Sequence, residues 1–473
     1  MPEARHKKIP RGARGRRSSA PRVTLVLTAA VLLPMLLALA GCSSEKPPVE
    51  TPRLLFFGVD SGNWNILTPM IQAGELPNMA SLVERGSFGV LKSGVPIQSP
   101  QMWTSIATGV VPEKHGIMRF TAEIPGTGRE VPVTSNMRKV KAFWNILSEA
   151  DITVGIVGWW PSWPAEPVNG FMIAQRAWPV NWSRHGIPFG AARDESGRLI
   201  VEDFEGRTYP EELYADFEPF IITEEDVTAD ELSRLFQDPA FTDPAKQFYA
   251  RWVFAKDKTF ADAGLAMLKR FHPDVLALYL QGPDVVSHYY WGYQREEGFT
   301  VSPADERLYG RVVRNYYRYV DGVIGSYLAE VGDETTVMIV SDHGFETKRD
   351  LKERWERGER IRTEEGGKDV PWDHGVDGIF IMTGPGVKKN NRLPDMSVVD
   401  VTPTMLAYLG LPVAEDMDGA PGLAALEESF LKEHPVTFVP TYETGGPRGD
   451  EAPMESPMDE GIKEKLRALG YIE

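Results

Sequence analysis

Five short apolar runs are spread along the chain, and each has the length of a β-strand. They cover residues 53–59, 153–159, 274–280, 335–340 and 378–382. Continuous apolar runs of this length are typical of strands that are buried on both faces of a sheet. Segments with helical spacing of apolar residues lie between them, at 65–72, 79–85, 141–150, 260–270, 311–330 and 402–409. This alternation predicts an α/β fold in which helices cover both faces of a mostly parallel sheet.

Two regions depart from the alternation. Residues 121–250 are richer in Pro, Trp and acidic residues and lose their periodicity after Trp160, so we expect an insertion or cap over the sheet. Residues 441–473 are rich in Pro, Gly, Met and acidic residues, a composition that predicts a flexible C-terminal tail. The main domain is therefore expected to span residues 53–440.

The N-terminus has the pattern of an export signal. Eight Lys or Arg residues lie within the first 22 positions, and an apolar run follows at 23–41. The sequence LAGC that ends at Cys42 resembles the bacterial lipobox, and Cys42 is the only cysteine in the chain. We expect a lipoprotein signal peptide over 1–41, lipidation of Cys42 and a tether over 42–52. An uncleaved membrane anchor and ordinary secretion are the alternatives.

Charge narrows the choice of partners. Loss of residues 1–41 removes eight basic residues and one acidic residue and takes the formal charge from −16 to −23. So acidic a protein is not expected to bind a nucleic-acid backbone or to adhere electrostatically to anionic lipid. Acyl chains on Cys42 would hold it to the membrane instead. The expected location is the cell envelope, on the periplasmic or the surface face, and Ser43 is compatible with the outer membrane.

Metal-ligand side chains follow the predicted strands. Ligands of open α/β sheets bind beyond the carboxyl ends of the strands. Taken singly, each of these side chains has an ordinary explanation, such as a helix cap or a surface pair. Together, three Asp and three His are what two adjacent divalent ions require, and zinc accepts both ligand types. The six residues are Asp60, Asp284, His288, Asp342, His343 and His374.

A hydroxyl group completes the candidate site. Residues 96–109 read as a loop, Ser99 as N-cap, Pro100 at the first helical position and a short helix that ends at Gly109. A helix N-terminus suits an incoming phosphate, and a metal ion beside Ser99 would make its hydroxyl a better nucleophile. On spacing alone, three other hydroxyl residues compete with Ser99: Ser61, Thr104 and Ser105.

The order of these residues resembles that of the alkaline phosphatase superfamily, most closely its type I phosphodiesterase/nucleotide pyrophosphatase branch. The resemblance rests on the six Asp and His residues and on three sequence stretches, SPQMWTSIATG at 99–109, PEKHGI at 112–117 and TPTMLAYLGLP at 402–412. It covers roughly residues 53–420. It implies an alkaline-phosphatase-like three-layer α/β/α sandwich with an inserted cap.

The resemblance also implies roles for the site residues. Asp284, His288 and His374 would bind one zinc ion, and a second would lie beside Ser99, held by Asp60, Asp342 and His343. Ser99 would attack phosphorus in line and form a phosphoserine. The expected function is that of an exported, lipid-anchored two-zinc phosphohydrolase that acts on phosphodiesters or related small phosphate esters. A phospho-group transferase acting on envelope lipids or glycans, and a non-catalytic metal-binding lipoprotein, are the alternatives.

Some positions depart from the family pattern. The nucleophile of nucleotide pyrophosphatases is usually threonine, and Phe120 stands where these enzymes have an asparagine that contacts the phosphoryl group. Arg119 either recognises an extra phosphate charge, which would favour a monoester or phosphonate, or is a surface arginine. The aromatic residues at 159–163, with Trp178 and Trp182, either line a substrate cleft or pack in the core. The sequence predicts no oligomeric state.

Overall fold

The computed structural model describes residues 53–178, 204–359, 370–444, 449 and 451–472. The predicted signal peptide, the tether with Cys42, and Trp182 lie outside this range. Among the described residues, no helix combines the length and the hydrophobicity that crossing a bilayer requires.

The apolar runs form the centre of a ten-stranded sheet, as counted in the described residues. They are β1 (Leu54–Val59), β5 (Val154–Val157), β8 (Val275–Leu280), β9 (Thr336–Val340) and β12 (Asp377–Thr383). The order is β13-β2-β12-β9-β1-β8-β5-β6-β7, and β14 pairs with β2. The flanking strands are β2 (Ser87–Lys92), β6 (Gly170–Ile173), β7 (Thr208–Tyr209), β13 (Asn391–Arg392) and β14 (Met396–Ser397).

Most strand pairs are parallel, as the sequence predicts. β1 runs parallel to β8 and β9, and β5 runs parallel to β8 and β6. β12 is the exception in the centre, because it is antiparallel to both β2 and β9. The start of β12 therefore lies at the edge of the sheet where its neighbours β2 and β9 end.

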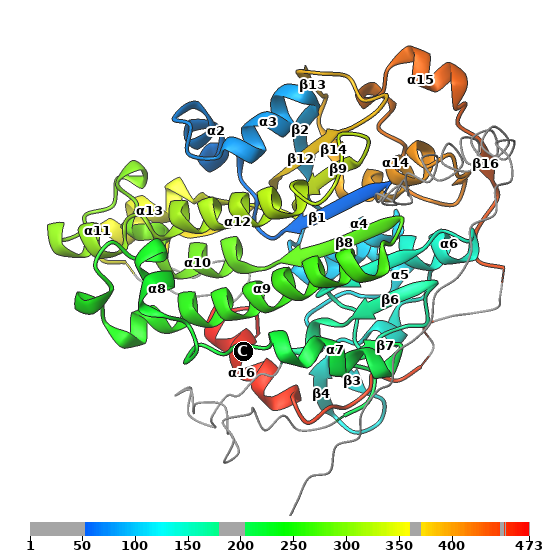
Figure 1. Cartoon of the computed structure of the whole chain (residues 1–473). Coiled ribbons are helices and arrows are strands. Elements are labelled where there is room, and N and C mark those ends of the chain that lie inside the picture. Colours follow the sequence, from blue (N-terminus) through cyan, green and yellow to red (C-terminus); the bar gives the residue numbers. More distant parts are fainter. Residues whose placement is uncertain (1–52, 179–203, 360–369, 445–448, 450, 473) are drawn as a thin grey trace, which may run out of the picture. The chain divides into compact units, whose positions relative to one another are not determined.

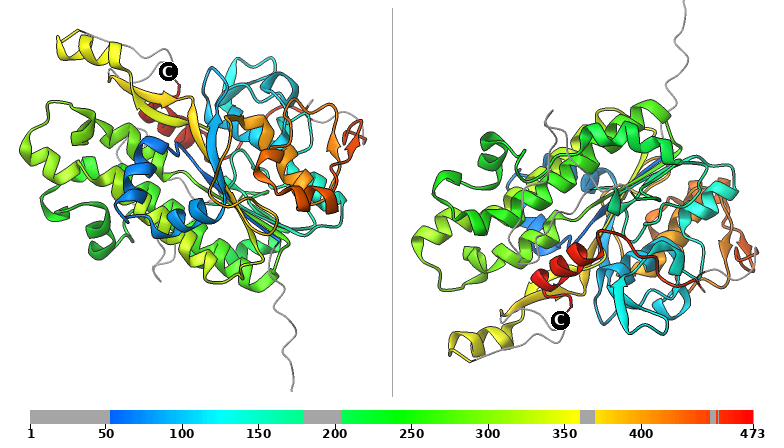
Figure 2. Two further views of the ribbon diagram at one scale, coloured as in Figure 1. Left: turned by 90° about the horizontal axis from the view of Figure 1, so that it is seen from above. Right: turned by 90° about the horizontal axis from the view of Figure 1, so that it is seen from below.

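Helices cover both faces of the sheet (Figures 1 and 2). Successive strand residues point to opposite faces, so Leu55 and Phe57 of β1 join one apolar cluster and Leu54 and Phe56 join the other. The first cluster includes α2 (Trp64–Gln72), α3 (Pro77–Arg85), α8 (Ala229–Leu235), α9 (Pro244–Phe271), α10 (Gly282–Tyr290) and α12 (Val312–Leu328). The second includes α4 (Ser99–Thr108), α6 (Phe143–Glu149) and α14 (Val401–Tyr408). This three-layer α/β/α arrangement confirms the predicted fold class.

Region 121–250 is only in part the separate cap that the sequence analysis expects. β5, β6 and β7 extend the main sheet, while β3 (Thr121–Ile124) and β4 (Arg129–Pro132) form a separate antiparallel hairpin. α7 (Tyr214–Phe217) and the first turns of α9 also come from this region. Edge strands as short as these leave little periodic signal in a sequence, which is why the pattern fades there.

The prediction of a flexible tail is wrong for the end of the chain. Residues Asp459–Leu469 form helix α16, whose apolar residues Ile462, Leu466 and Leu469 are buried. These residues recur at a spacing of four and three, so they form one stripe that packs on the main domain. Helix α16, in red in Figure 1, lies next to β4 of the separate hairpin. A second antiparallel hairpin pairs β10 (Gly344–Thr347) with β11 (Trp372–Gly375). The composition of residues 441–473 gives no sign of this stripe, because the residues that precede it are acidic and rich in Pro.

The remaining elements connect these layers. They are the helices α5 (Pro112–His115), α11 (Pro303–Tyr309), α13 (Arg349–Glu356) and α15 (Glu428–Glu433), and the short parallel pair β15 (Val413–Ala414) and β16 (Phe438–Val439).

Candidate metal centre and nucleophile

The six predicted metal ligands meet at one edge of the sheet. Asp60 directly follows β1, and Asp342 and His343 follow β9 after one serine. α10 begins two residues after β8 and carries Asp284 and His288 on its inner side. His374 arrives from β11, which pairs with β10 and leads into the antiparallel strand β12. The strand ends, helix α10 and the β10/β11 hairpin thus bring together residues from four parts of the chain.

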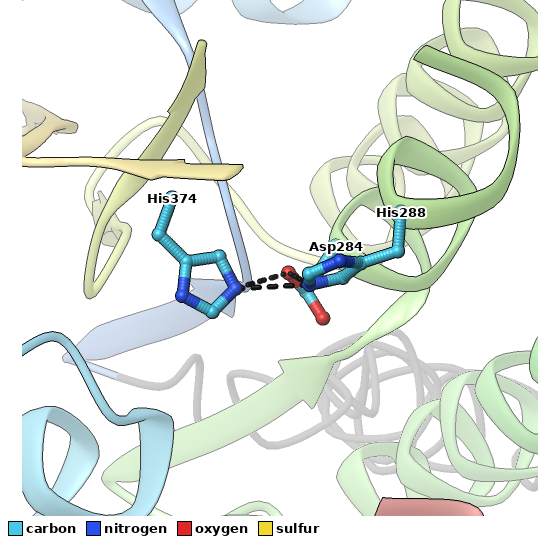
Figure 3. A group of neighbouring side chains, drawn as sticks. All are labelled: Asp284, His288 and His374. Atoms are coloured by element: carbon cyan, nitrogen blue, oxygen red, sulfur yellow. Dashed lines mark hydrogen bonds and ion pairs between the residues drawn. The ribbon is translucent and has the colours of Figure 1, made fainter. Parts of the chain in front are cut away.

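Asp284, His288 and His374 form the first group of candidate ligands (Figure 3). Asp284 Oδ1 lies 3.4 Å from the Nε2 atoms of both histidines. The two Nε2 atoms lie 3.0 Å from each other. All three side chains are buried or nearly so. One carboxylate oxygen and two imidazole nitrogens that converge in this way are a donor set that zinc accepts.

Asp60, Asp342 and His343 form the second group. His343 Nε2 lies 3.4 Å from Asp60 Oδ1 and 3.4 Å from Asp342 Oδ2. His343 Nδ1 donates to the Gly344 carbonyl over 2.9 Å, which leaves Nε2 as the acceptor that faces the carboxylates. Ligand atoms of Asp60, Asp284 and His343 also lie within 4.8 Å of one another, so the two groups adjoin.

Three carboxylate oxygens of these groups have the surroundings of metal ligands. Asp60 Oδ1, Asp284 Oδ1 and Asp342 Oδ2 are buried and accept no hydrogen bond from any residue that the structure describes. Buried polar atoms are normally satisfied, and a cation is a partner that would satisfy all three. The residues present therefore fit divalent metal ions.

The pKa values of the three carboxyl groups are shifted by their burial and by the charges of neighbouring site residues. Burial, and then the charge of Asp284, raise the pKa of Asp60 to about 7. Burial and the neighbouring Asp60 also raise the pKa of Asp342 well above its ordinary value. Burial alone would raise the pKa of Asp284, but His288 and His374 hold it well below the usual range. A bound cation would favour the ionised form of all three.

Ser99 lies beside the second group. It is the first residue of α4, and Gln98 is the N-cap, so Ser99 does not have the capping role that its position in the sequence suggests. Its side chain is 5% exposed, and its Oγ lies 3.5 Å from His343 Nε2. The hydroxyl is thus placed at the helix N-terminus and against a candidate ligand at the same time.

The competing hydroxyls face other partners. Ser61 Oγ donates to the Gly344 carbonyl, and Thr104 Oγ1 donates to the Pro100 carbonyl over 2.6 Å. Ser105 Oγ lies 3.0 Å from Nε2 of the buried His115. Among these hydroxyls, the geometry favours Ser99 as the one that a metal-bound phosphate would meet.

Arg119 and Phe120 lie near the site in different ways. Both line an open cavity of about 1200 Å³. Arg119 is exposed, whereas Phe120 is 4% exposed and stacks on Tyr471 with ring centroids 4.5 Å apart. Of the tryptophans, Trp159 and Trp163 are core residues, while Trp160 and Trp178 line a small enclosed cavity that also contains Ser99.

Two tyrosines of the site are missed by sequence reasoning. Tyr279, on β8, donates to Asp60 Oδ2. Tyr471, after α16, donates to Asp284 Oδ2, and its hydroxyl lies 3.1 Å from His288 Nε2. Tyr279 could have been found from the sequence, because it lies one residue before the end of β8, at the edge of the sheet where the candidate ligands gather. Tyr471 lies in a region that composition assigns to a tail, and no spacing signal connects it to the site.

Comparison with known proteins shows which family model and which solved structures match this chain. The sequence model of the type I phosphodiesterase/nucleotide pyrophosphatase family matches residues 54–410, a range that contains Ser99 and all six candidate ligands and ends before α16. No curated protein matches the chain. Solved structures that match include human ectonucleotide pyrophosphatase/phosphodiesterase 5, at 13% identity over 79% of this chain and 99% of that one, with a TM-score of 0.44. A 2-O GAG sulfatase matches at 13% identity over 80% of this chain and 74% of its own, also with a TM-score of 0.44.

Proposed function

Because the chain belongs to the type I phosphodiesterase/nucleotide pyrophosphatase family and is a phosphate ester hydrolase, we propose that it cleaves phosphodiester or related phosphate ester bonds through a phosphoserine on Ser99. The observation that carries the proposal is the contact of a buried serine at a helix N-terminus with one of two adjoining groups of metal-ligand side chains.

Two divalent ions, which we propose are Zn²⁺, are part of this proposal. Asp284, His288 and His374 would hold one of them, and Asp60, Asp342 and His343 would hold the other. When bound, the ions supply the positive charge that stabilises the Ser99 alkoxide and the phosphoryl oxygens.

The protein's own residues account for the remaining steps. His343 is fixed by its bond to Gly344 and keeps its Nε2 toward Ser99 Oγ. The α4 N-terminus directs backbone N–H groups at the phosphoryl oxygens. Ser99 Oγ forms a bond to phosphorus as the bond to the ester oxygen breaks, and that oxygen leaves as the alcohol. Water then cleaves the phosphoserine and restores the Ser99 hydroxyl.

Substitution of Ser99 tests the nucleophile. Ser99→Ala is expected to lower kcat on bis-p-nitrophenyl phosphate and p-nitrophenyl phosphate by about a thousandfold or more, because the covalent route is lost. Zinc content, measured by elemental analysis, is expected to stay unchanged. Ser105→Ala is the matched control on the same helix, since Ser105 faces His115 instead. Wild-type turnover by Ser99→Ala would remove Ser99 from the proposal.

Lipid anchoring to the cell envelope is a separate part of the proposal. It is supported by the basic and apolar N-terminal sequence and by the position of Cys42 after LAG. In a bacterial host, Cys42→Ser is expected to move the protein from the membrane fraction to the soluble fraction or to leave its precursor unprocessed. A Cys42→Ser protein with wild-type processing and membrane attachment would contradict lipidation.

A further inference from the structure

A small enclosed cavity lies beside Ser99, on the side where α16 packs. Its volume is about 30 Å³, more than the space that one water molecule needs. Besides Ser99, its wall includes Lys256 of α9, Gln281 between β8 and α10, Lys465 of α16 and Tyr471. The cavity therefore has room for a phosphoryl oxygen beside Ser99.

Two buried ammonium groups meet at this cavity. Lys256 Nζ donates to Gln281 Oε1 over 2.7 Å, and Lys465 Nζ donates to the same oxygen over 3.1 Å. Lys465 Nζ also lies 3.9 Å from the centre of the Trp252 ring. Lys256 is 4% exposed and Lys465 is 6% exposed. The two lysines thus share one neutral amide oxygen out of reach of bulk water.

Nearby Arg176 shows how this protein satisfies a buried cation when the role is structural. Arg176 lines the same cavity, but it forms an ion pair with Asp459 at 2.8 Å and donates to the Pro132 and Val133 carbonyls. Neither Lys256 nor Lys465 has a carboxylate within ion-pair distance in the part of the chain that the structure describes. Asp60, Asp257 and Asp284 attract the two ammonium groups without forming an ion pair with either. Burial of cations that lack a paired carboxylate is costly, so packing alone does not account for this pair.

An anion in the cavity would remove that cost. Burial lowers the pKa of Lys256 to about 8 and the pKa of Lys465 well below its ordinary value. Both groups would be fully charged once a negative oxygen accepted their hydrogen bonds, and charge-assisted bonds of this kind are the strong ones. The only negative group that the proposed reaction brings next to Ser99 is the phosphoryl group.

We propose that Lys256 and Lys465 form a binding site for a non-esterified phosphoryl oxygen, and that the preferred substrates are phosphate monoesters or other terminal, dianionic phosphoryl groups. This inference rests on the proposed function. The cavity has room for a phosphoryl oxygen, and two ammonium groups favour the dianion over a monoanionic diester. The organic part of the substrate would lie in the open cavity of about 1200 Å³, which shares Phe120 and Tyr471 with the small one.

Lys465→Met tests the site, because methionine has a similar length and can keep the contact with Trp252. For the zinc-loaded protein, kcat/KM on p-nitrophenyl phosphate is expected to fall about tenfold or more, and that on bis-p-nitrophenyl phosphate by less than about threefold. The Kd of inorganic phosphate, measured by calorimetry, is expected to rise about tenfold or more. The Tm is expected not to fall, since a buried charge is removed.

Lys258→Met is the matched control. Lys258 also lies on α9, but it is partly exposed and pairs with Asp262 at 2.7 Å, so all three quantities are expected to stay at wild-type values. Lys256→Met provides a second variant with the same expectation as Lys465→Met if the latter does not fold. Equal effects on the monoester and the diester, no effect on either, or a wild-type protein that does not bind phosphate would overturn the site. A wild-type protein that binds phosphate but hydrolyses neither ester would instead contradict the proposed function.

Discussion

At the scale of single residues, the site is a cluster of carboxylates that are buried before any ion is present. Asp60 and Asp342 have raised pKa values for this reason, and Asp60 is half protonated near pH 7. A carboxyl whose pKa is raised by folding takes up a proton in the folded state. In the metal-free protein, the contribution of Asp60 to stability therefore falls as the pH rises from about 4 through 7.

The same protons must leave when metal binds. Calorimetric titration of zinc in buffers of different ionisation enthalpy measures how many are released. We expect more protons to be released at pH 6 than at pH 8, because Asp60 is mostly protonated at the lower pH and mostly ionised at the higher one. Asp60→Asn should release fewer protons at pH 6 than the wild type. Proton release that is independent of pH would contradict the burial of a protonated Asp60.

His115 gives a pH dependence of stability that is separate from the metal groups. Burial, and then the charge of Arg138, lower the pKa of His115 to about 3. Its Nδ1 accepts a hydrogen bond from the Ile117 N–H over 3.1 Å, and its Nε2 faces Ser105 Oγ. Both nitrogens of the neutral ring therefore have hydrogen-bond partners. Below an unfolded pKa of about 6.5, the unfolded chain binds a proton that the folded protein does not, and stability falls.

The expected contribution is about 1.4 kcal/mol per pH unit between pH 6 and pH 4. It can be measured as the difference between the pH slopes of urea unfolding for the wild type and for His115→Gln, both free of metal. The variant should be less stable at pH 7 but should lose stability less steeply toward low pH. Parallel slopes would show that His115 is protonated in the folded state.

Sequence reasoning identified the residues of the site better than their surroundings. The six Asp and His residues lie next to strand ends, so the strand pattern already predicts that they meet. Tyr471 and Lys465 reach the site only through the packing of α16, and Lys256 reaches it from the middle of α9. A side chain placed by helix packing carries no local signal, because its neighbours in space are far away in the sequence.

At the scale of elements, the strand pattern predicts most of the sheet but not the direction of every strand. The apolar run at 378–382 matches β12 closely, but nothing in its composition shows that it runs antiparallel to β9. This direction is what brings His374 to the ligand edge, since His374 precedes the strand. The predicted helix at 260–270 is only the end of the 28-residue helix α9, whose first turns lie in the irregular region.

The start of α10 is the most constrained junction of an element with the site. A Cβ added to Gly282 would overlap the Tyr316 ring, and Gly282 N–H donates to Asp257 Oδ2 over 2.8 Å. Gly282→Ala is expected to cost about 2 kcal/mol or more and to weaken metal binding, because α10 must move with Asp284 and His288. The measurements are urea unfolding of the metal-free protein and the Kd of zinc.

Gly322→Ala is the control for this effect. Gly322 is an exposed residue inside α12, and nothing lies within 4 Å of an added Cβ. It is expected to raise stability by about 0.5–1 kcal/mol, as alanine does in helices, with no effect on zinc affinity. If Gly282→Ala behaved like Gly322→Ala, then α10 would not be held by the contact with Tyr316.

At the scale of the whole molecule, the end of the chain is part of the site. The family match ends at residue 410, yet Tyr471 bonds to Asp284 and Lys465 lines the cavity beside Ser99. An ion pair also connects α16 to the segment that follows β6. It joins Asp459 of α16 to Arg176, and the two side chains are 9% and 2% exposed. The C-terminal helix α16 therefore contributes to the candidate site from outside the part of the chain that the family model matches.

The Asp459–Arg176 pair provides the test of that connection. Asp459→Asn leaves the buried Arg176 without its counter-charge, so the free energy of unfolding is expected to fall by about 3 kcal/mol. Glu460→Gln, at the next position, removes a largely exposed carboxylate and is expected to change stability by less than about 0.5 kcal/mol. In limited proteolysis, Asp459→Asn should be cut within 451–472 earlier than the wild type or Glu460→Gln. Equal stability and equal cleavage of the two variants would mean that this ion pair does not hold α16 to the domain. If the pair did hold it, loss of the buried counter-charge would lower stability and speed cleavage in Asp459→Asn alone.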